Sequence, residues 1–255
     1  MRDALFWGMK VIVITGASGG IGAATAELLA QATEHQLVLV SRRRDALEAV
    51  GARCHGRAAV LVGDMERRDC VRAVVQDAIR RFGSISTWIN NAGRGIFRPP
   101  SEVTDADIDA MMSANVKTAL YGMQEVLPHF KERGDGHFIN VSSLLGRLPA
   151  ATYRSAYTAA KHFLNALTVQ MRDEVSATHP GIAFSLVSPG AAATDFGRNA
   201  LHGGPDSRDI PNRQPVEEVA AVIARVVETR EPDVYTRAGS RERVLAWYQA
   251  NGVDP

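Results

Sequence analysis

The sequence predicts a doubly wound α/β fold, in which helices cover both faces of a parallel sheet. Short runs of β-branched and apolar residues alternate with helical stretches from one end of the chain to the other. These runs are apolar on both faces, which is typical of strands buried between two layers of helices. With 255 residues, of which 45% are hydrophobic, the chain can bury a sizeable core. We therefore expect one domain spanning residues 1–255, without internal repeats.

Seven runs have the length and composition of buried strands. They cover residues 11–14, 37–40, 58–62, 87–89, 137–141, 182–187 and 234–235. The helical stretches between them place apolar residues three or four positions apart. They cover residues 21–32, 45–50, 67–82, 155–175 and 216–229. One more helix is expected to begin at Thr104, because Asp107 three residues later completes a capping-box pattern.

The segment 195–215 has the composition of a loop. It contains Gly197, Gly203, Gly204, Pro205 and Pro211 and shows little hydrophobic periodicity. A loop of this length inside a compact domain is usually functional. We expect it to be a lid over a substrate site, and a disordered insertion is the alternative.

Composition and charge exclude several classes of function. Lys and Arg number 29 and Asp and Glu 28, so a net charge of +1 offers no broad field to nucleic acid or an anionic membrane. Cys54, Cys70 and the seven histidines lack metal-ligand spacing, and we expect free thiols and no metal. No apolar run approaches the ~18 residues of a membrane span, and residues 1–7 do not resemble a signal peptide. We expect a cytoplasmic protein.

A glycine-rich turn follows the first predicted strand. Between Thr15 and Gly22 the chain reads Thr-Gly-Ala-Ser-Gly-Gly-Ile-Gly, and its glycines allow a sharp turn and a close approach of backbone to a diphosphate. The first N–H groups of the following helix would face that anion. The candidate nucleotide-binding residues in this turn are Gly16, Ser18, Gly20, Ile21 and Gly22.

The end of the second predicted strand indicates which nucleotide binds. Dinucleotide folds that use NAD usually have an acid here, which bonds the ribose 2′-hydroxyl. This chain has Ser41, Arg42, Arg43 and Arg44 instead. Without a carboxylate to repel a 2′-phosphate, and with guanidinium groups to pair with it, NADP(H) is favoured over NAD(H). Arg42 beside Ser41 is the preferred phosphate ligand, and Arg43 and Arg44 are alternatively solvated residues at a helix start.

Tyr157 and Lys161 form the candidate catalytic pair. Four residues apart on a predicted helix, they project from one face, so the amine can lie beside the phenol. A free tyrosine titrates near pH ~10, and a nearby positive charge, such as that of Lys161 or a nicotinamide ring, lowers the pKa of the phenol. Such a tyrosine can exchange a proton with a carbonyl or alcohol oxygen while hydride moves to or from the nucleotide.

Further motifs occur in an order that resembles the short-chain dehydrogenase/reductase family. They are Asn90-Asn91-Ala92-Gly93, Asn115, Ser142-Ser143, and Pro189-Gly190-Ala191-Ala192-Ala193-Thr194, and with the glycine turn they span residues 15–194. The resemblance implies a seven-stranded parallel sheet in the Rossmann order 3-2-1-4-5-6-7 and a homodimer or homotetramer. It also implies an NADP(H)-dependent oxidoreductase acting on a carbonyl or secondary alcohol.

The resemblance also assigns roles to residues. Tyr157 is the acid/base, Lys161 lowers its pKa and holds the nicotinamide ribose, Ser143 steadies the substrate oxygen, and Asn115 positions a water in a proton relay. The remaining cofactor contacts that it implies are Asp64 at the adenine, Asn91 and Gly93 at the adenosine-side turn, and Pro189, Gly190, Ala192 and Thr194 at the nicotinamide.

Ser143 lies fourteen residues before Tyr157, where the family more often has thirteen. We expect one extra residue in the intervening loop. Strand alternation leaves one serine of the pair facing the pocket, and either Ser142 or Ser143 satisfies it.

The expected substrate pocket is mainly apolar, walled by Ile96, Phe97, Leu145 and Tyr153. This predicts a small neutral, hydrophobic ketone, aldehyde or alcohol, although Arg94, Arg98 and Arg147 nearby leave an anionic substrate open.

Two rival functions stay open as well. Gly16-Ala17-Ser18-Gly19-Gly20 also satisfies G-x-S-x-G, the nucleophile elbow of serine hydrolases, with Ser18 as the nucleophile. A non-catalytic NADPH-binding regulator is the second rival.

Overall fold

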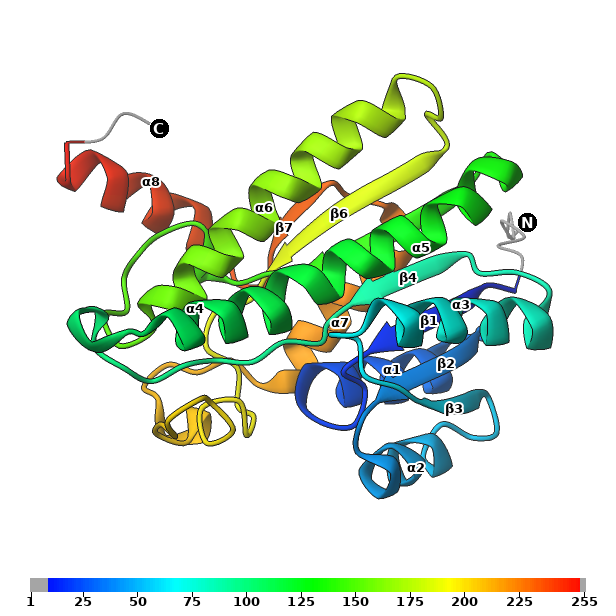
Figure 1. The fold of residues 1–255 in the computed structure, drawn as a ribbon, viewed down its shortest axis with the longest axis horizontal. Helices are drawn as coiled ribbons and strands as arrows, with labels where there is room; N and C mark the ends of the chain where they lie inside the picture. Colours follow the sequence, from blue (N-terminus) through cyan, green and yellow to red (C-terminus); the bar gives the residue numbers. More distant parts are fainter. Residues whose placement is uncertain (1–8, 253–255) are drawn as a thin grey trace, which may run out of the picture.

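The computed structural model describes residues 9–252, and its centre is a parallel sheet (Figure 1). In these residues the sheet has seven strands in the order β3-β2-β1-β4-β5-β6-β7, and every neighbouring pair is parallel, as expected. The strands are β1 Val11–Thr15, β2 Gln36–Ser41, β3 Ala58–Val62, β4 Thr87–Asn90, β5 Gly136–Val141, β6 Ile182–Ser188 and β7 Asp233–Tyr235.

Helices connect the strands and lie within one or two residues of the predicted bounds wherever both ends were predicted. They are α1 Gly20–Ala32, α2 Arg44–Ala52, α3 Arg68–Phe82, α4 Asp105–Met112, α5 Thr118–Arg133, α6 Ser155–Ser176, α7 Val216–Thr229 and α8 Ser240–Ala250. The helix predicted to begin at Thr104 is interrupted by a π-helical turn, Ser113–Lys117, which joins α4 to α5. Helix α8 was not predicted.

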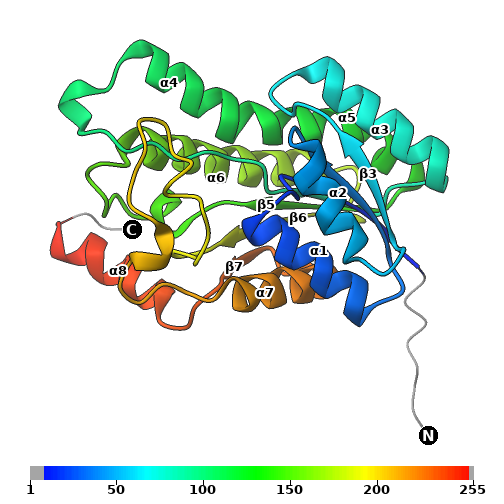
Figure 2. The same ribbon diagram turned by 90° about the horizontal axis from the view of Figure 1, so that it is seen from below.

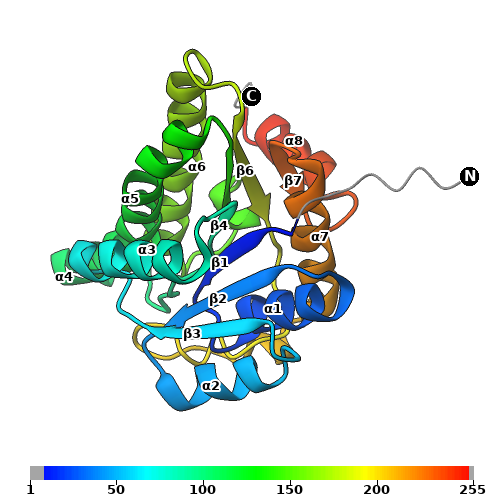
Figure 3. The same ribbon diagram turned by 90° about the vertical axis from the view of Figure 1, so that its right-hand side faces the viewer.

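Side chains of β1 alternate between two cores, one on each face of the sheet. Ile12 and Ile14 pack with α1, α2 and α7, whereas Val11 and Val13 pack with α3, α5 and α6. Figures 2 and 3 show the sheet between these two helical layers. The strands are therefore buried on both faces, which explains their continuous apolar runs.

Thr104 caps helix α4 as predicted. Its side chain accepts a hydrogen bond from the backbone N–H of Asp107, and the Asp107 carboxylate accepts one from the backbone N–H of Thr104. This reciprocal pair satisfies two N–H groups that the first helical turn leaves without partners. It confirms the capping box.

Other expectations concern targeting and metal binding. Residues 1–7, whose composition argued against a signal peptide, lie outside the described residues. Between residues 9 and 252, no helix combines the length and apolar composition that a bilayer span requires. Within the same range no group of His, Cys, Asp and Glu side chains is arranged to hold a metal ion.

Candidate active site

The carboxyl ends of the strands meet at one edge of the sheet, and the loops after them line a cleft of about 1030 Å³. Such an edge is where open α/β sheets bind ligands. Most of the predicted nucleotide-binding residues line this cleft, although they lie far apart in the sequence. These residues are Gly16, Ser18, Gly20, Ile21, Ser41, Arg42, Asp64, Asn91, Gly93, Tyr157, Lys161, Pro189, Gly190, Ala192 and Thr194.

The glycine turn packs too closely against the rest of the cleft for a side chain. Gly16 has φ +67°, and a Cβ there would lie 2.9 Å from the Cα of Ala92. Gly22 lies behind the turn rather than on the cleft surface, where a Cβ would come within 2.6 Å of the Gly16 carbonyl oxygen. Asn91 braces the turn, because its Nδ2 donates to the carbonyl oxygens of Thr15 at 3.0 Å and Gly16 at 3.3 Å. The backbone can therefore approach a bound diphosphate.

Ser18, Ser41 and Arg43 form a hydrogen-bonded cluster beside the glycine turn. The Ser18 hydroxyl lies 2.7 Å from that of Ser41 and accepts bonds from Arg43 Nε at 3.2 Å and Nη2 at 3.0 Å. No carboxylate takes part. A guanidinium group beside the Ser18 oxygen cannot act as its general base, so this arrangement does not support the serine-hydrolase alternative.

Arg42, the predicted phosphate ligand, has a different setting from Arg43. Its Nη1 lies 3.3 Å from a carboxylate oxygen of Glu66 and 3.9 Å from one of Asp64. The Arg42 side chain also lines the cleft but is largely exposed. The arginine held directly against the turn is therefore Arg43, which the sequence did not distinguish from a solvated residue.

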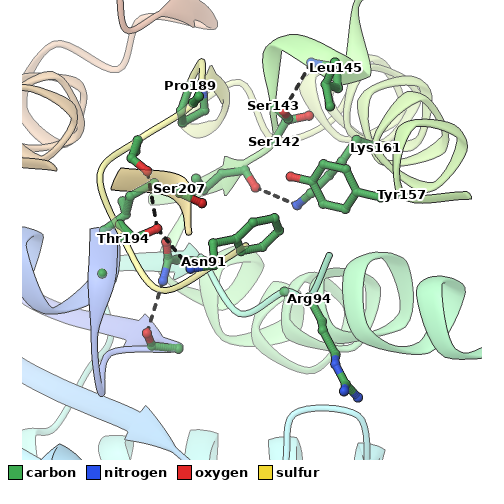
Figure 4. A pocket seen from close by; sticks show the side chains of 18 of the residues that line it. Asn91, Arg94, Ser142, Ser143, Leu145, Tyr157, Lys161, Pro189, Thr194 and Ser207 are labelled. Carbon is green, nitrogen blue, oxygen red and sulfur yellow. Dashed lines mark hydrogen bonds between the residues drawn. The ribbon is translucent and has the colours of Figure 1, made fainter. Parts of the chain in front are cut away.

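Tyr157, Lys161 and Ser143 come together at the other half of the cleft (Figure 4). All three are buried, and Lys161 Nζ lies 5.7 Å from the centre of the Tyr157 ring while donating to the carbonyl oxygen of Val141 at 3.0 Å. The Ser142 hydroxyl instead donates to Asn165 on helix α6. Ser143 is therefore the serine that faces Tyr157, and its hydroxyl accepts from the backbone N–H of Leu145 at 3.1 Å.

Burial controls the ionisation of both members of the pair. It raises the pKa of the Tyr157 phenol to about 12, against the lowering effects of the Ser143 hydrogen bond and the charge of Arg154. Burial also lowers the pKa of the Lys161 amine to about 8. Desolvation disfavours the charged form of each group, and the lowering of the Tyr157 pKa by Lys161 or a nicotinamide ring stays a prediction.

Asn115 lies in the π-helical turn between α4 and α5 and is fully buried. Its Oδ1 accepts from the backbone N–H of Arg94 at 3.2 Å, and its Nδ2 donates to the carbonyl oxygens of Arg94 at 2.9 Å and Met111 at 3.1 Å. Single π-helical turns are frequent at functional sites. Asn115 thus holds the loop after β4 from behind and does not line the cleft.

The loop after β6 forms the wall opposite the glycine turn. The Pro189 carbonyl oxygen accepts from the backbone N–H of Leu144 at 2.7 Å, which ties this loop to the one after β5. Thr194 accepts a bond from the backbone N–H of Phe196 at 3.3 Å, at the start of the segment 195–215. That segment passes over the cleft and contributes Asp195, Phe196, Asn199, Ser207, Ile210, Pro211, Asn212 and Gln214 to its lining.

Only one of the four residues predicted to wall the substrate pocket lines this cleft. Leu145 lines the cleft, but Ile96, Phe97 and Tyr153 do not. Ile96 is fully buried beside Leu201, with which its backbone forms a bridge. The Phe97 and Tyr153 rings stack on each other at 5.0 Å, and Tyr153 is 50% exposed. The two rings pack on each other outside the cleft, whereas Phe196 and Arg154 line it.

Comparisons with known proteins agree with this geometry. Residues 10–203 match the family model described as short chain dehydrogenase. The NADP-dependent 3-hydroxy acid dehydrogenase of Schizosaccharomyces pombe is 30% identical over 233 residues, which cover 87% of this chain and 88% of that protein.

Two solved structures are similar over most of their length. A short-chain dehydrogenase from Sphingobium yanoikuyae in complex with NADPH has a TM-score of 0.80 and 28% identity, covering 96% of this chain and 94% of that one. A short chain dehydrogenase/reductase from Burkholderia phymatum in complex with NAD has a TM-score of 0.87 and covers 100% of this chain and 98% of that one. At 21% identity the second likeness is one of fold alone.

Proposed function

Because this chain belongs to the short-chain dehydrogenase family of nicotinamide-dependent oxidoreductases, we propose that it transfers hydride between NADP(H) and a carbonyl or secondary alcohol, with Tyr157 as the acid/base. One observation carries the proposal. The buried Ser143, Tyr157 and Lys161 lie in the same cleft as the glycine turn. A proton-transfer group and a nucleotide site are thus adjacent, as carbonyl reduction requires.

The residues present fit a nicotinamide nucleotide. The glycine turn leaves backbone N–H groups and the start of α1 open to a diphosphate, and the loop after β6 lines the opposite wall. Gly190 has no atom within 4 Å of where a Cβ would lie, so the cleft is open beside it. When bound there, the nicotinamide supplies or accepts the hydride.

This chain's own side chains handle the proton. The high pKa of Tyr157 keeps the phenol protonated at neutral pH, so it can donate to the oxygen of a carbonyl substrate. Ser143 lies in the same cleft beside Tyr157 and would orient the same oxygen. Lys161 Nζ, beside the Tyr157 ring, is placed to bind ribose hydroxyls and to return a proton to the tyrosine.

The end of β2 supports NADP(H) over NAD(H). Ser41 stands where NAD-binding folds usually have an acid, and it belongs to the cluster with Ser18 and Arg43. These two hydroxyls and one guanidinium can bind a 2′-phosphate through charge-assisted hydrogen bonds. Arg42, paired with Glu66 in the structure, is a second cation within the same wall.

The proposal is tested by measuring nucleotide oxidation with the purified protein across a panel of ketones, aldehydes and oxo acids, using NADPH and NADH in parallel. We expect carbonyl-dependent oxidation of NADPH with a higher kcat/KM than for NADH. Absence of turnover on the whole panel, with tight NADPH binding, would favour the non-catalytic regulator. Faster turnover with NADH would overturn the cofactor assignment.

A further inference from the structure

Arg154 has an unusual position for a charged side chain. It directly precedes helix α6 and lines the cleft three residues before Tyr157. Its Nη1 is buried and has no hydrogen-bond partner, and the guanidinium makes no ion pair with any of residues 9–252. The residue as a whole is half-buried, and partial desolvation of a cation without a counter-charge is unfavourable.

The surroundings of Arg154 hold it beside the reacting groups. Its guanidinium carbon lies 5.8 Å from the centre of the Phe196 ring, and that ring lies 5.4 Å from the ring of Tyr157. A Cβ at Gly95 would come within 2.7 Å of Arg154 Nη1, so the guanidinium occupies space that only a glycine leaves free. Arg154 and Tyr157 therefore flank one aromatic ring on the cleft wall.

Of the other arginines near this end of the cleft, three have hydrogen-bond or ion-pair partners and one is exposed. Arg94 Nε donates to the carbonyl oxygen of Asn199 at 3.3 Å, and its side chain points away from Tyr157 in Figure 4. Arg98 pairs with Asp107 at 2.7 Å, and Arg147 pairs with Asp233 at 2.6 Å. Arg243 also lines the cleft, but it is exposed. Arg154 differs from all four in that its buried Nη1 has no hydrogen-bond partner and its guanidinium makes no ion pair within the described residues.

We propose that Arg154 binds a carboxylate group of the substrate, so that the preferred substrates are oxo acids and the corresponding hydroxy acids. This inference rests on the proposed function and names its substrate class. One guanidinium offers one positive charge and a planar fork of donors, which match a carboxylate. The carbon chain of the substrate would pack on Phe196, between the carboxylate at Arg154 and the reacting oxygen at Tyr157.

The proposal replaces the neutral substrate that the sequence suggested. That expectation depended on Ile96, Phe97, Leu145 and Tyr153 as an apolar wall, and of these only Leu145 lines the cleft. Arg154 takes no part in the bond changes. In reduction, the carbonyl carbon gains a hydride and its oxygen gains the Tyr157 proton, while the carboxylate stays unchanged.

The first test compares each oxo acid with its methyl ester, which has the same carbonyl but no charge. Suitable pairs are pyruvate, acetoacetate and levulinate with their methyl esters, each reduced with saturating NADPH. We expect the acids to have the higher kcat/KM in the unaltered protein. In Arg154→Met the ratio of acid to ester should fall by about 10- to 100-fold, since a hydrogen bond to a charged group contributes roughly 1.5–3 kcal/mol.

Two further variants separate carboxylate binding from other effects. Gly95→Ala should displace both the guanidinium and the neighbouring Phe196 ring without removing the positive charge, and we expect it to lower the same ratio. Arg94→Met is the matched control, because its side chain lines the cleft but points away from Tyr157, and it should leave the ratio within about threefold. Melting temperatures and NADPH affinities establish that each variant is folded.

A binding measurement avoids dependence on turnover. Calorimetric titration of the protein with NADP⁺ present should detect binding of hexanoate and not of hexanamide, and Arg154→Met should abolish the difference. Equal loss of acid and ester turnover in Arg154→Met, with unchanged hexanoate binding, would overturn the proposal, because Arg154 would then act only on Tyr157. If the unaltered protein reduces neutral ketones or aldehydes but neither oxo acids nor their esters, the inference about Arg154 is wrong and the proposed function stands. If it reduces no carbonyl compound, the proposed function fails, while hexanoate binding still tests Arg154.

Discussion

Lys161 Nζ lies 5.7 Å from the centre of the Tyr157 ring, and both side chains are almost completely removed from water. Four residues apart on one helix, they face the same cleft. Their burial pushes the two pKa values apart, with the phenol at about 12 and the amine at about 8. At neutral pH both groups therefore hold a proton, which is the arrangement that carbonyl reduction requires.

The pKa of the Lys161 amine predicts how NADPH affinity depends on pH. Because burial lowers the pKa of Lys161 to about 8, its positive charge is present below pH 8 and is lost as the pH rises through that value. We expect the NADPH dissociation constant to increase over this range and Lys161→Met to remove the pH dependence. Fluorescence titrations between pH 6 and 10 measure this. An affinity independent of pH in the unaltered protein would contradict the role of the amine.

The preference for NADPH over NADH should depend on Arg43, and to a smaller extent on Arg42. Arg43 bonds Ser18 directly, whereas Arg42 is paired with Glu66. We expect Arg43→Ala to lower kcat/KM for NADPH by about 10- to 100-fold, the equivalent of roughly 1.5–3 kcal/mol, and to change the NADH value much less. Arg42→Ala should act in the same direction by a smaller factor. Equal losses with both nucleotides in both variants would show that neither arginine binds the 2′-phosphate.

Asn115 should stabilise the loop after β4, through its hydrogen bonds to the backbone of Arg94. Asn115→Ala would remove the hydrogen bonds to the backbone N–H and C=O groups of Arg94, and a hydrogen bond of this kind contributes about 0.5–1.5 kcal/mol. We expect a lower free energy of unfolding and a lower kcat. Urea denaturation and steady-state kinetics measure the two effects. Unchanged stability and kcat would mean that the π-helical turn does not depend on this amide.

The cap of helix α4 gives a prediction about stability alone. Thr104→Ala removes the side-chain acceptor for the Asp107 N–H, and losing such a cap costs about 1 kcal/mol. Thr104→Ser keeps the hydroxyl and should cost much less. Thermal unfolding of the two variants compares them directly, and equal melting temperatures would rule out a contribution from the capping bond.

The sheet and its helices could be predicted because each depends on a local pattern. The β-branched runs identify the strands, and the capping-box pattern locates the start of α4. Helix α8 was missed because only Ser240 and Val244 of its residues are buried, so its apolar periodicity is weak.

The site was only partly predictable, because some of its contacts follow a local sequence pattern and others form only in the folded chain. Tyr157 and Lys161 are neighbours on one helix, so their spacing already places them together. Arg43 meets Ser18 across 25 positions in the chain, and the stacking of Phe97 on Tyr153 depends on tertiary packing. Arg154 had no local pattern at all, since its significance is the absence of a partner in the folded chain.

Replacement of Tyr157 by phenylalanine tests the account most directly. Tyr157→Phe removes one hydroxyl and keeps the ring that packs against Phe196. We predict that the rate of carbonyl reduction falls by about 10²- to 10⁴-fold, the usual contribution of a general acid, while NADPH affinity and melting temperature stay close to those of the unaltered protein. Turnover at an unchanged rate in this variant would contradict the central claim that the phenol supplies the proton.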